Sequence, residues 1–165
     1  HGNDITESID TDLLEEAGGR FVTNNGIPFA IPPSGKDAVF TSLYDNFPDS
    51  IEIPVKMNGR KIYFLVAASI STAQSRMENA RITVLLGDGT RRILSLRDPE
   101  NIDDWLGSGS GIPYVQSGQV QKLGSQTHAV LHEIDFGEEK DIQSVILETR
   151  TCETMVGLLG MTVMH

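Results

Sequence analysis

The sequence contains a single cysteine, Cys152, among its 165 residues. It therefore has no partner for an internal disulfide and too few thiolates for a zinc site built from cysteines. We expect Cys152 to be a buried structural thiol, the usual state of a lone cysteine in a packed domain. No apolar run approaches the ~18 residues of a membrane span, and no secretory signal is recognisable, so we expect no span and a chain that is mature, trimmed or excised from something longer.

Positive charge is also scarce. Lys and Arg together number 13 against 23 Asp and Glu, which gives a formal net charge of -10. Nucleic-acid binding depends on cationic side chains that displace counterions from phosphates, and neither a basic stripe nor an RNA-binding aromatic motif is present. The composition therefore argues against nucleic acid as a partner and is compatible with a neutral ligand such as a sugar.

The length suits one domain, since a chain of roughly 150 residues buries about 70% of its unfolded surface. Residues 1–11 are polar and acidic, as in a flexible tail or linker, and residues 12–165 are predicted to form the domain. A short helix is expected over residues 12–17, with Asp12 as its N-cap and Gly18-Gly19 as its stop.

The run Ile62 to Ile70 is continuously apolar and rich in aromatic and β-branched side chains. With Asn58-Gly59 before it as a turn signal, it predicts a central strand that is buried on both faces. Such a strand needs a layer on each face, or a strongly curved sheet around it.

Several shorter stretches supply the strands for those layers. Pro54 lacks an N–H, so its strand should be an edge or carry a bulge, and Asp88-Gly89 between two β-rich runs predicts a hairpin over 80–97. The other expected strands are 21–23, 27–31, 38–41, 50–57, 127–136, 142–149 and 154–164. The sequence thus predicts an all-β, two-layer β-sandwich with one short N-terminal helix.

A family resemblance narrows this further. The stretches Gly26 to Ile31, Asp37 to Thr41, Phe47 to Val55 and Lys61 to Leu65, followed by Gln74-Ser75-Arg76, the hairpin and a terminal strand, resemble the galactose-binding-like jelly-roll domains. Those domains are accessory modules of secreted bacterial glycoside hydrolases and related polysaccharide-degrading enzymes. The resemblance covers roughly residues 20 to 164 and rests on residues that pack or turn.

The resemblance implies a jelly-roll fold, a secreted, periplasmic or cell-surface location, and a noncatalytic carbohydrate-binding module. The alternative is a structural scaffold that packs against a glycoside hydrolase catalytic domain and has no ligand of its own. In such modules the central strand continues as Leu-His-Ala, whereas this chain has Leu65-Val66-Ala67. The histidine of the family pattern has no counterpart here, so the resemblance implies no catalytic or ligand histidine in this chain. The domain itself is expected not to be an enzyme.

The stretch from 98 to 114 is the longest irregular one and holds the best candidate ligand residues. Aromatic rings stack on sugar faces while carboxylates and amides accept from hydroxyls, and long loops on a rigid scaffold commonly carry binding sites. The predicted ligand-binding residues are Trp105, Tyr114, Asp103, Asp104, Asn101 and Arg76. The alternative is that Trp105 plugs one end of the sandwich, in which case the scaffold function is favoured.

The acidic residues of this stretch allow two more specific interpretations. Asp98 with Asp103 or Asp104 could form the carboxylate pair of a hydrolase, but adjacent acids in one loop lack the fixed partner and burial that a general acid needs. A structural calcium ion is an alternative, bound by this stretch or by Asn24, Asn25 and Asp45. No nucleophile, triad or cofactor motif accompanies them.

A metal site at the two internal histidines is not expected. His128 and His132 lie four residues apart on a predicted strand, which places them on one face about 13 Å from each other. That separation is too large for both to bind one ion.

Overall fold

The computed structural model describes residues 18–31, 38–44, 46–106, 115, 120–124 and 126–165. In this part of the chain the regular structure is β apart from one 3-10 helix, so the expected all-β class is confirmed. The tail expected over residues 1–11 and the helix expected over 12–17 lie outside the described residues. None of the described helical structure is long and apolar enough to cross a membrane.

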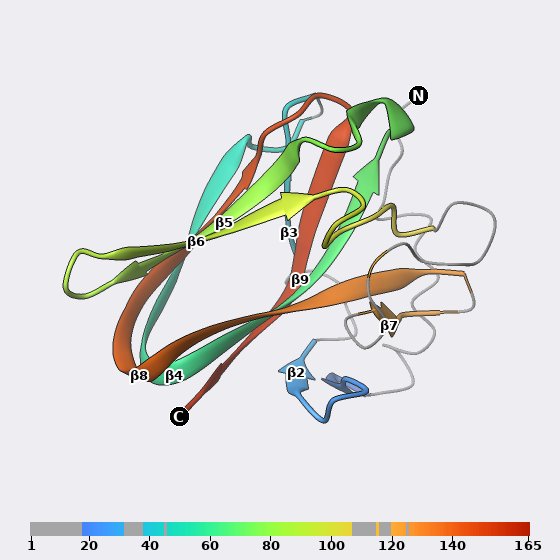
Figure 1. Cartoon of the computed structure of the whole chain (residues 1–165). Coiled ribbons are helices and arrows are strands. Elements are labelled where there is room, and N and C mark those ends of the chain that lie inside the picture. The colour runs from blue at the N-terminus through green and yellow to red at the C-terminus, as the bar shows by residue number, and fades with distance from the viewer. Residues whose placement is uncertain (1–17, 32–37, 45, 107–114, 116–119, 125) are drawn as a thin grey trace.

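Within the described residues, nine strands form two antiparallel sheets (Figure 1). β1 and β2 pair alone, while the others follow the order β3-β9-β4-β8-β5-β6, with β7 added alongside β8. The elements are β1 (Arg20–Val22), β2 (Pro28–Ala30), β3 (Val39–Ser42), β4 (Ser50–Ile70), η1 (Thr72–Gln74), β5 (Glu78–Leu86), β6 (Arg91–Arg97), β7 (Val120–Lys122), β8 (His128–Thr149) and β9 (Thr154–Met164).

The two longest strands, β4 and β8, divide the large sheet into two halves. Residues 61–66 of β4 pair with β8 beside β9, whereas residues 50–59 pair with β8 beside β5. Both strands curve between these regions, as Figure 1 shows. A hydrophobic cluster joins side chains of both halves, including Phe64 from the first and Val84 from the second, so the halves face each other across a shared core.

The prediction for the central strand is confirmed. Residues 62–68 of β4 are all buried, and β4 lies between β8 and β9. Phe64 and Val66 belong to the core between the halves, while Tyr63 and Leu65 belong to a second cluster on the opposite face of the sheet. The alternation of a strand thus directs one run of apolar residues into two separate cores.

The turn predicted at Asn58-Gly59 is wrong, because both residues lie inside β4. Gly59 is needed for a close approach instead: a Cβ there would meet Val163 Cγ1 at 2.3 Å. The expected strands 50–57 and 62–70 are therefore one strand, with register shifts between Pro54 and Met57 and between Gly59 and Lys61. The strands expected at 127–136 and 142–149 are likewise one strand, β8.

Several local predictions hold. Pro54 lies at a register shift in the part of β4 that pairs with β8 alone, so it has both the edge position and the bulge expected. β5 and β6 form the predicted hairpin, and Gly89 has the positive φ of 84° that its turn requires. The final strand was predicted over 154–164 and spans Thr154–Met164.

The prediction of a buried Cys152 is wrong, since this residue is exposed. It lies in the short turn that joins β8 to β9, where Glu153 has a positive φ of 50°. A tight turn at the end of two long strands projects beyond both cores, so its thiol meets solvent.

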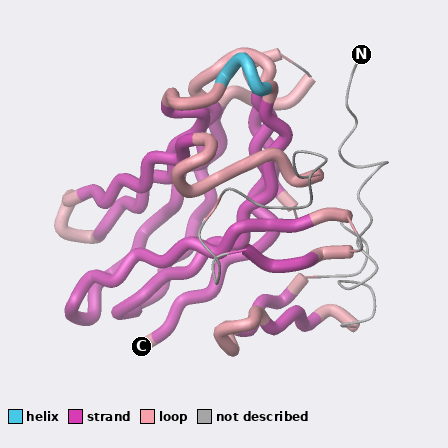
Figure 2. Tube along the Cα trace, turned by 45° about the vertical axis from the view of Figure 1, so that its right-hand side comes forward, coloured by secondary structure: helices cyan, strands magenta, loops and turns pink. Residues whose placement is uncertain are grey.

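The small β1-β2 sheet is not paired with the large one, and it lies near the C-terminal end of β9 (Figure 2). Phe29 of β2 is 1% exposed and packs over Gly160 of β9, where an added Cβ would lie 2.9 Å from its ring. Thr162 Oγ1 donates a hydrogen bond to the carbonyl oxygen of Pro28. These contacts attach the small sheet to the outer face of the large one.

Candidate functional site

The segment that follows β6 holds most of the predicted ligand residues, and it is anchored to the large sheet. The pairing of β4 with β8 ends at Val66 and Val130. Just beyond it, the Trp105 N–H donates to the Ala68 carbonyl at 2.8 Å, and the His128 N–H donates to the Trp105 carbonyl at 3.0 Å. Trp105 therefore bridges the two strands where their own hydrogen bonds stop.

The side chain of Trp105 is buried, with 3% of its surface exposed. It belongs to the second hydrophobic cluster, together with Phe21, Phe29, Tyr63 and Leu65. A ring in this position presents no face to solvent on which a sugar could stack. Tyr114, the other predicted aromatic ligand, lies outside the described residues.

Asp103 and Asp104 both bind neighbouring elements of the fold. Asp103 is 6% exposed, and its Oδ1 lies 2.6 Å from Nε2 of His128. Asp104 accepts hydrogen bonds from the backbone N–H groups of Ile70 and Leu106 through its two carboxylate oxygens. Burial raises the pKa of Asp104, and the two backbone hydrogen bonds oppose that shift.

Asp98 lies close enough to these acids to interact with them. Burial raises the pKa of Asp98, and the charges of Asp103 and Asp104 raise it further. Its backbone is fixed on both sides: the carbonyl accepts from the Arg76 N–H at 2.6 Å, and the N–H donates to Asn79 Oδ1 at 2.9 Å. The three acids suggested for a hydrolase are thus neighbours.

The carboxylates nevertheless lack the arrangement that glycoside hydrolysis needs. One acid must be free to protonate a leaving group while the other faces the substrate. Here Asp103 is occupied by His128, and both oxygens of Asp104 hold backbone N–H groups. These contacts instead attach the segment that follows β6 to β4 and β8, which is a structural role.

Asn101 and Arg76 complete the set of predicted ligand residues. Asn101 accepts the Arg97 N–H through Oδ1 and donates to the Ser95 carbonyl through Nδ2, so both ends of its amide close the turn after β6. Arg76 is exposed, has a positive φ of 63° and donates its backbone N–H to the Asp98 carbonyl. The structure therefore brings Asn101, Asp103, Asp104 and Trp105 together in one short segment, and Arg76 contacts that segment through Asp98.

The second set of residues suggested for calcium comes from other parts of the chain. Asn24 and Asn25 are exposed in the turn between β1 and β2, and the Asn24 N–H donates to Gln121 Oε1. Asp45 lies outside the described residues. Within the described ranges, no three side chains of His, Cys, Asp or Glu form a group suited to a metal ion.

Comparison with known proteins gives no match. No family model, no curated protein and no solved structure is similar to this chain. The galactose-binding-like resemblance therefore remains a prediction from the sequence.

The two internal histidines have different surroundings. His128 pairs with Asp103, whereas His132 is opposite Phe64 on β4, on the face that forms the core between the halves. His132 is 5% exposed, and its Nε2 has no hydrogen-bond partner. Burial lowers the pKa of His132 from 6.5 to about 4, and no charged group contributes to this shift.

This depressed pKa predicts a loss of stability in acid. The unfolded chain takes up a proton at His132 near pH 6.5, whereas the folded chain does so only near pH 4. The unprotonated His132 therefore makes its full contribution to the free energy of unfolding above pH 6.5. As the pH falls toward 4, the free energy of unfolding decreases by about 3 kcal/mol in total. Asp98 and Asp104, whose pKa values are raised, act in the opposite sense, because their folded forms bind protons more readily.

A comparison with His132→Leu isolates the histidine, because the two aspartates are present in both proteins. Urea unfolding at pH 7.5 and at pH 4 is expected to show that the wild type loses more stability than the variant across this range. Equal pH dependence of the two proteins would contradict the assignment.

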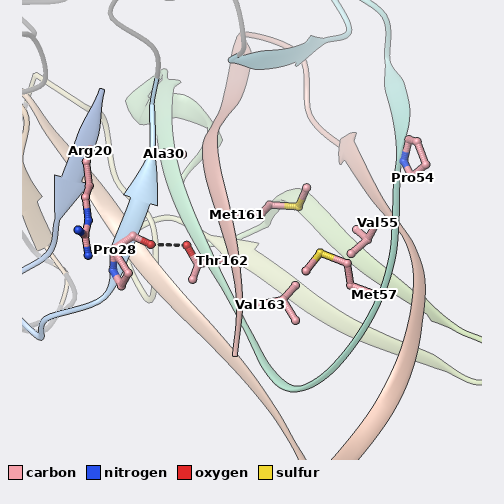
Figure 3. A pocket seen from close by; sticks show the side chains of 9 residues that line it. All are labelled: Arg20, Pro28, Ala30, Pro54, Val55, Met57, Met161, Thr162 and Val163. Carbon is pink, nitrogen blue, oxygen red and sulfur yellow. Dashed lines mark hydrogen bonds between the residues drawn. The ribbon is translucent and has the colours of Figure 1, made fainter. Parts of the chain in front are cut away.

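Sequence reasoning missed an apolar groove of about 580 Å³ that no residue of the Trp105 segment lines (Figure 3). Residues of β4 and β9 line it, and the small β1-β2 sheet borders it. Its lining comprises Arg20, Pro28, Ala30, Pro54, Val55, Met57, Met161, Thr162 and Val163. The available signal was the apolar alternation Ile51, Ile53, Val55, Met57, which continues past Pro54 to a residue that is 49% exposed.

Proposed function

We propose that this chain is a noncatalytic accessory domain of a polysaccharide-degrading enzyme, and that it serves as a scaffold that packs against a neighbouring domain. The observation that carries the proposal is the burial of Trp105. The expected sugar-binding ring is instead a core residue, and the polar side chains beside it hold backbone groups and His128. This is the arrangement expected of a structural plug.

The association with polysaccharide degradation rests on the sequence resemblance. The same resemblance suggests a jelly-roll topology and a secreted, periplasmic or cell-surface location in a bacterium. Two facing halves that share long antiparallel strands are compatible with that topology. A scaffold needs no cofactor, and calcium is not part of this proposal.

A carbohydrate-binding module is the second candidate, and one observation favours it. Tyr44, in the connection between β3 and β4, is 76% exposed. An exposed ring of this kind is available for stacking on a sugar. The acidic charge of the chain favours neutral glycans over uronate-rich ones in that case.

Glycan binding distinguishes the two candidates. The purified domain is applied to a glycan array, and any hit is measured by calorimetry with the wild type and with Tyr44→Ala. The scaffold function predicts no binding tighter than a millimolar dissociation constant, which is about -4 kcal/mol. A hit of tens of micromolar that is lost in Tyr44→Ala would overturn it in favour of the carbohydrate-binding module.

A further inference from the structure

The apolar groove has the composition of a protein-docking site. Two of its walls come from β4 and β9, and the methionines Met57 and Met161 lie on opposite sides (Figure 3). Methionine side chains are flexible and adapt to varied partner shapes. Met and Arg are also enriched in protein interfaces, whereas Lys, Glu and Asp are depleted, and this groove contains both of the former and none of the latter.

The single charged residue in the lining is a cation. Arg20 forms no ion pair with any described residue, which is also true of Lys56, Arg76, Arg91, Arg92, Arg97 and Lys122, but Arg20 alone among these lines the groove. The chain as a whole carries a net charge of -10. An exposed arginine without a carboxylate partner, beside an apolar surface on an acidic protein, favours a partner that supplies the carboxylate.

The free edge of β4 limits how a partner can bind. Between residues 50 and 59, β4 pairs with β8 on one side only. Pro54 has no N–H to donate on that edge, and Lys56, with a positive φ of 51°, breaks the extended backbone. A continuous ladder of backbone hydrogen bonds is therefore blocked, and the contact must be made by side chains.

We propose that the groove binds an apolar segment of the neighbouring domain that carries an acidic residue, with the carboxylate paired to Arg20. This inference rests on the proposed scaffold function and specifies the chemistry of its partner. The apolar side chains of the segment lie between Met57 and Met161, and the acid determines its position along the groove.

A pair of synthetic peptides tests this: acetyl-Val-Leu-Glu-Leu-Val-amide and its twin with Gln in place of Glu. Each is titrated into protein labelled with ¹³C at the methionine methyl groups. The Met57 and Met161 signals are expected to shift in a saturable way, with a dissociation constant on the order of a millimolar. Met77, which is 41% exposed outside the groove, serves as the internal control and should not shift.

Charge is tested by comparing the twins. At low salt the Glu peptide is expected to bind about threefold more tightly than the Gln peptide, the range of an exposed ion pair, and Arg20→Gln should abolish the difference. Met57→Glu is expected to weaken both peptides. Its matched control is Ile93→Glu, at a residue of β6 that is 59% exposed and outside the groove, which should bind as the wild type does.

The outcomes separate this inference from the proposed function. Equal binding of the twins would overturn the acidic partner while leaving the groove as a docking site. Absence of any shift at Met57 and Met161 would overturn the inference entirely. The scaffold function is decided independently, by the glycan array.

Discussion

Replacing Trp105 with alanine is expected to lower the free energy of unfolding by about 3–5 kcal/mol, the usual cost of removing a large aromatic ring from a core. Trp105 is 3% exposed and belongs to the same hydrophobic cluster as Phe21, Phe29 and Leu65. The substitution keeps the two backbone hydrogen bonds of residue 105, to Ala68 and His128, so the loss reports on the ring. Urea unfolding followed by circular dichroism measures it.

The neighbouring Leu106 provides the matched control, because it lies in the same segment but is 52% exposed. Leu106→Ala should change stability by less than about 1 kcal/mol, consistent with the small effect of most surface substitutions. Trp105→Phe, which retains most of the apolar volume, should fall between the two. If Trp105→Ala were as stable as the wild type, the ring would not be a core residue, and the scaffold proposal would lose its main support.

Leu65→Ala is expected to cost about 2–5 kcal/mol through lost burial and the cavity it leaves. Leu65 is 0% exposed, and it pairs with Leu131 of β8 on one side and Gly160 of β9 on the other. Gly160 has no side chain, and the closely packed Phe29 ring lies where one would be, so there is little that can move to fill the space. Collapse of the site is therefore limited, and we expect a value in the upper half of the range.

Chemical denaturation gives the measurement, with Ile93→Ala as control. Ile93 is also a strand residue and an aliphatic one, but it is 59% exposed, so its truncation should cost less than about 1 kcal/mol. A denaturation midpoint that Leu65→Ala leaves unchanged would show that β4 is not the strand on which both cores depend.

Local sequence signals were reliable where the structure they specify is itself local. The continuous apolar run marked the buried part of β4, and Asp88-Gly89 marked the β5-β6 turn, because a positive φ at Gly89 is a property of the turn alone. The same reasoning failed at Asn58-Gly59. There the glycine serves a contact with Val163, more than a hundred positions away, which no local pattern encodes.

The candidate site was predicted in part. The sequence placed Asn101, Asp103, Asp104 and Trp105 in one irregular segment, and the structure places them there too. It did not indicate that Asp103 binds His128, or that Arg76 meets the segment through its backbone. Both contacts depend on how the segment crosses from β6 to the ends of β4 and β8, and composition alone does not specify that path.

The sequence by itself determined that this protein is all-β and that residues 62–68 form a strand buried on both faces. Strand propensity and turn chemistry are properties of short segments, which is why the sequence was sufficient for both. Tertiary structure alone decided that Trp105 faces the core, that Cys152 faces solvent, and that Met57, Met161 and Arg20 share a groove. The physical reason is that burial depends on which distant segments cover a side chain. An exposed ring and a core ring have the same sequence signal, and only the cluster that Trp105 forms with residues of β1, β2, β4 and β8 distinguishes them.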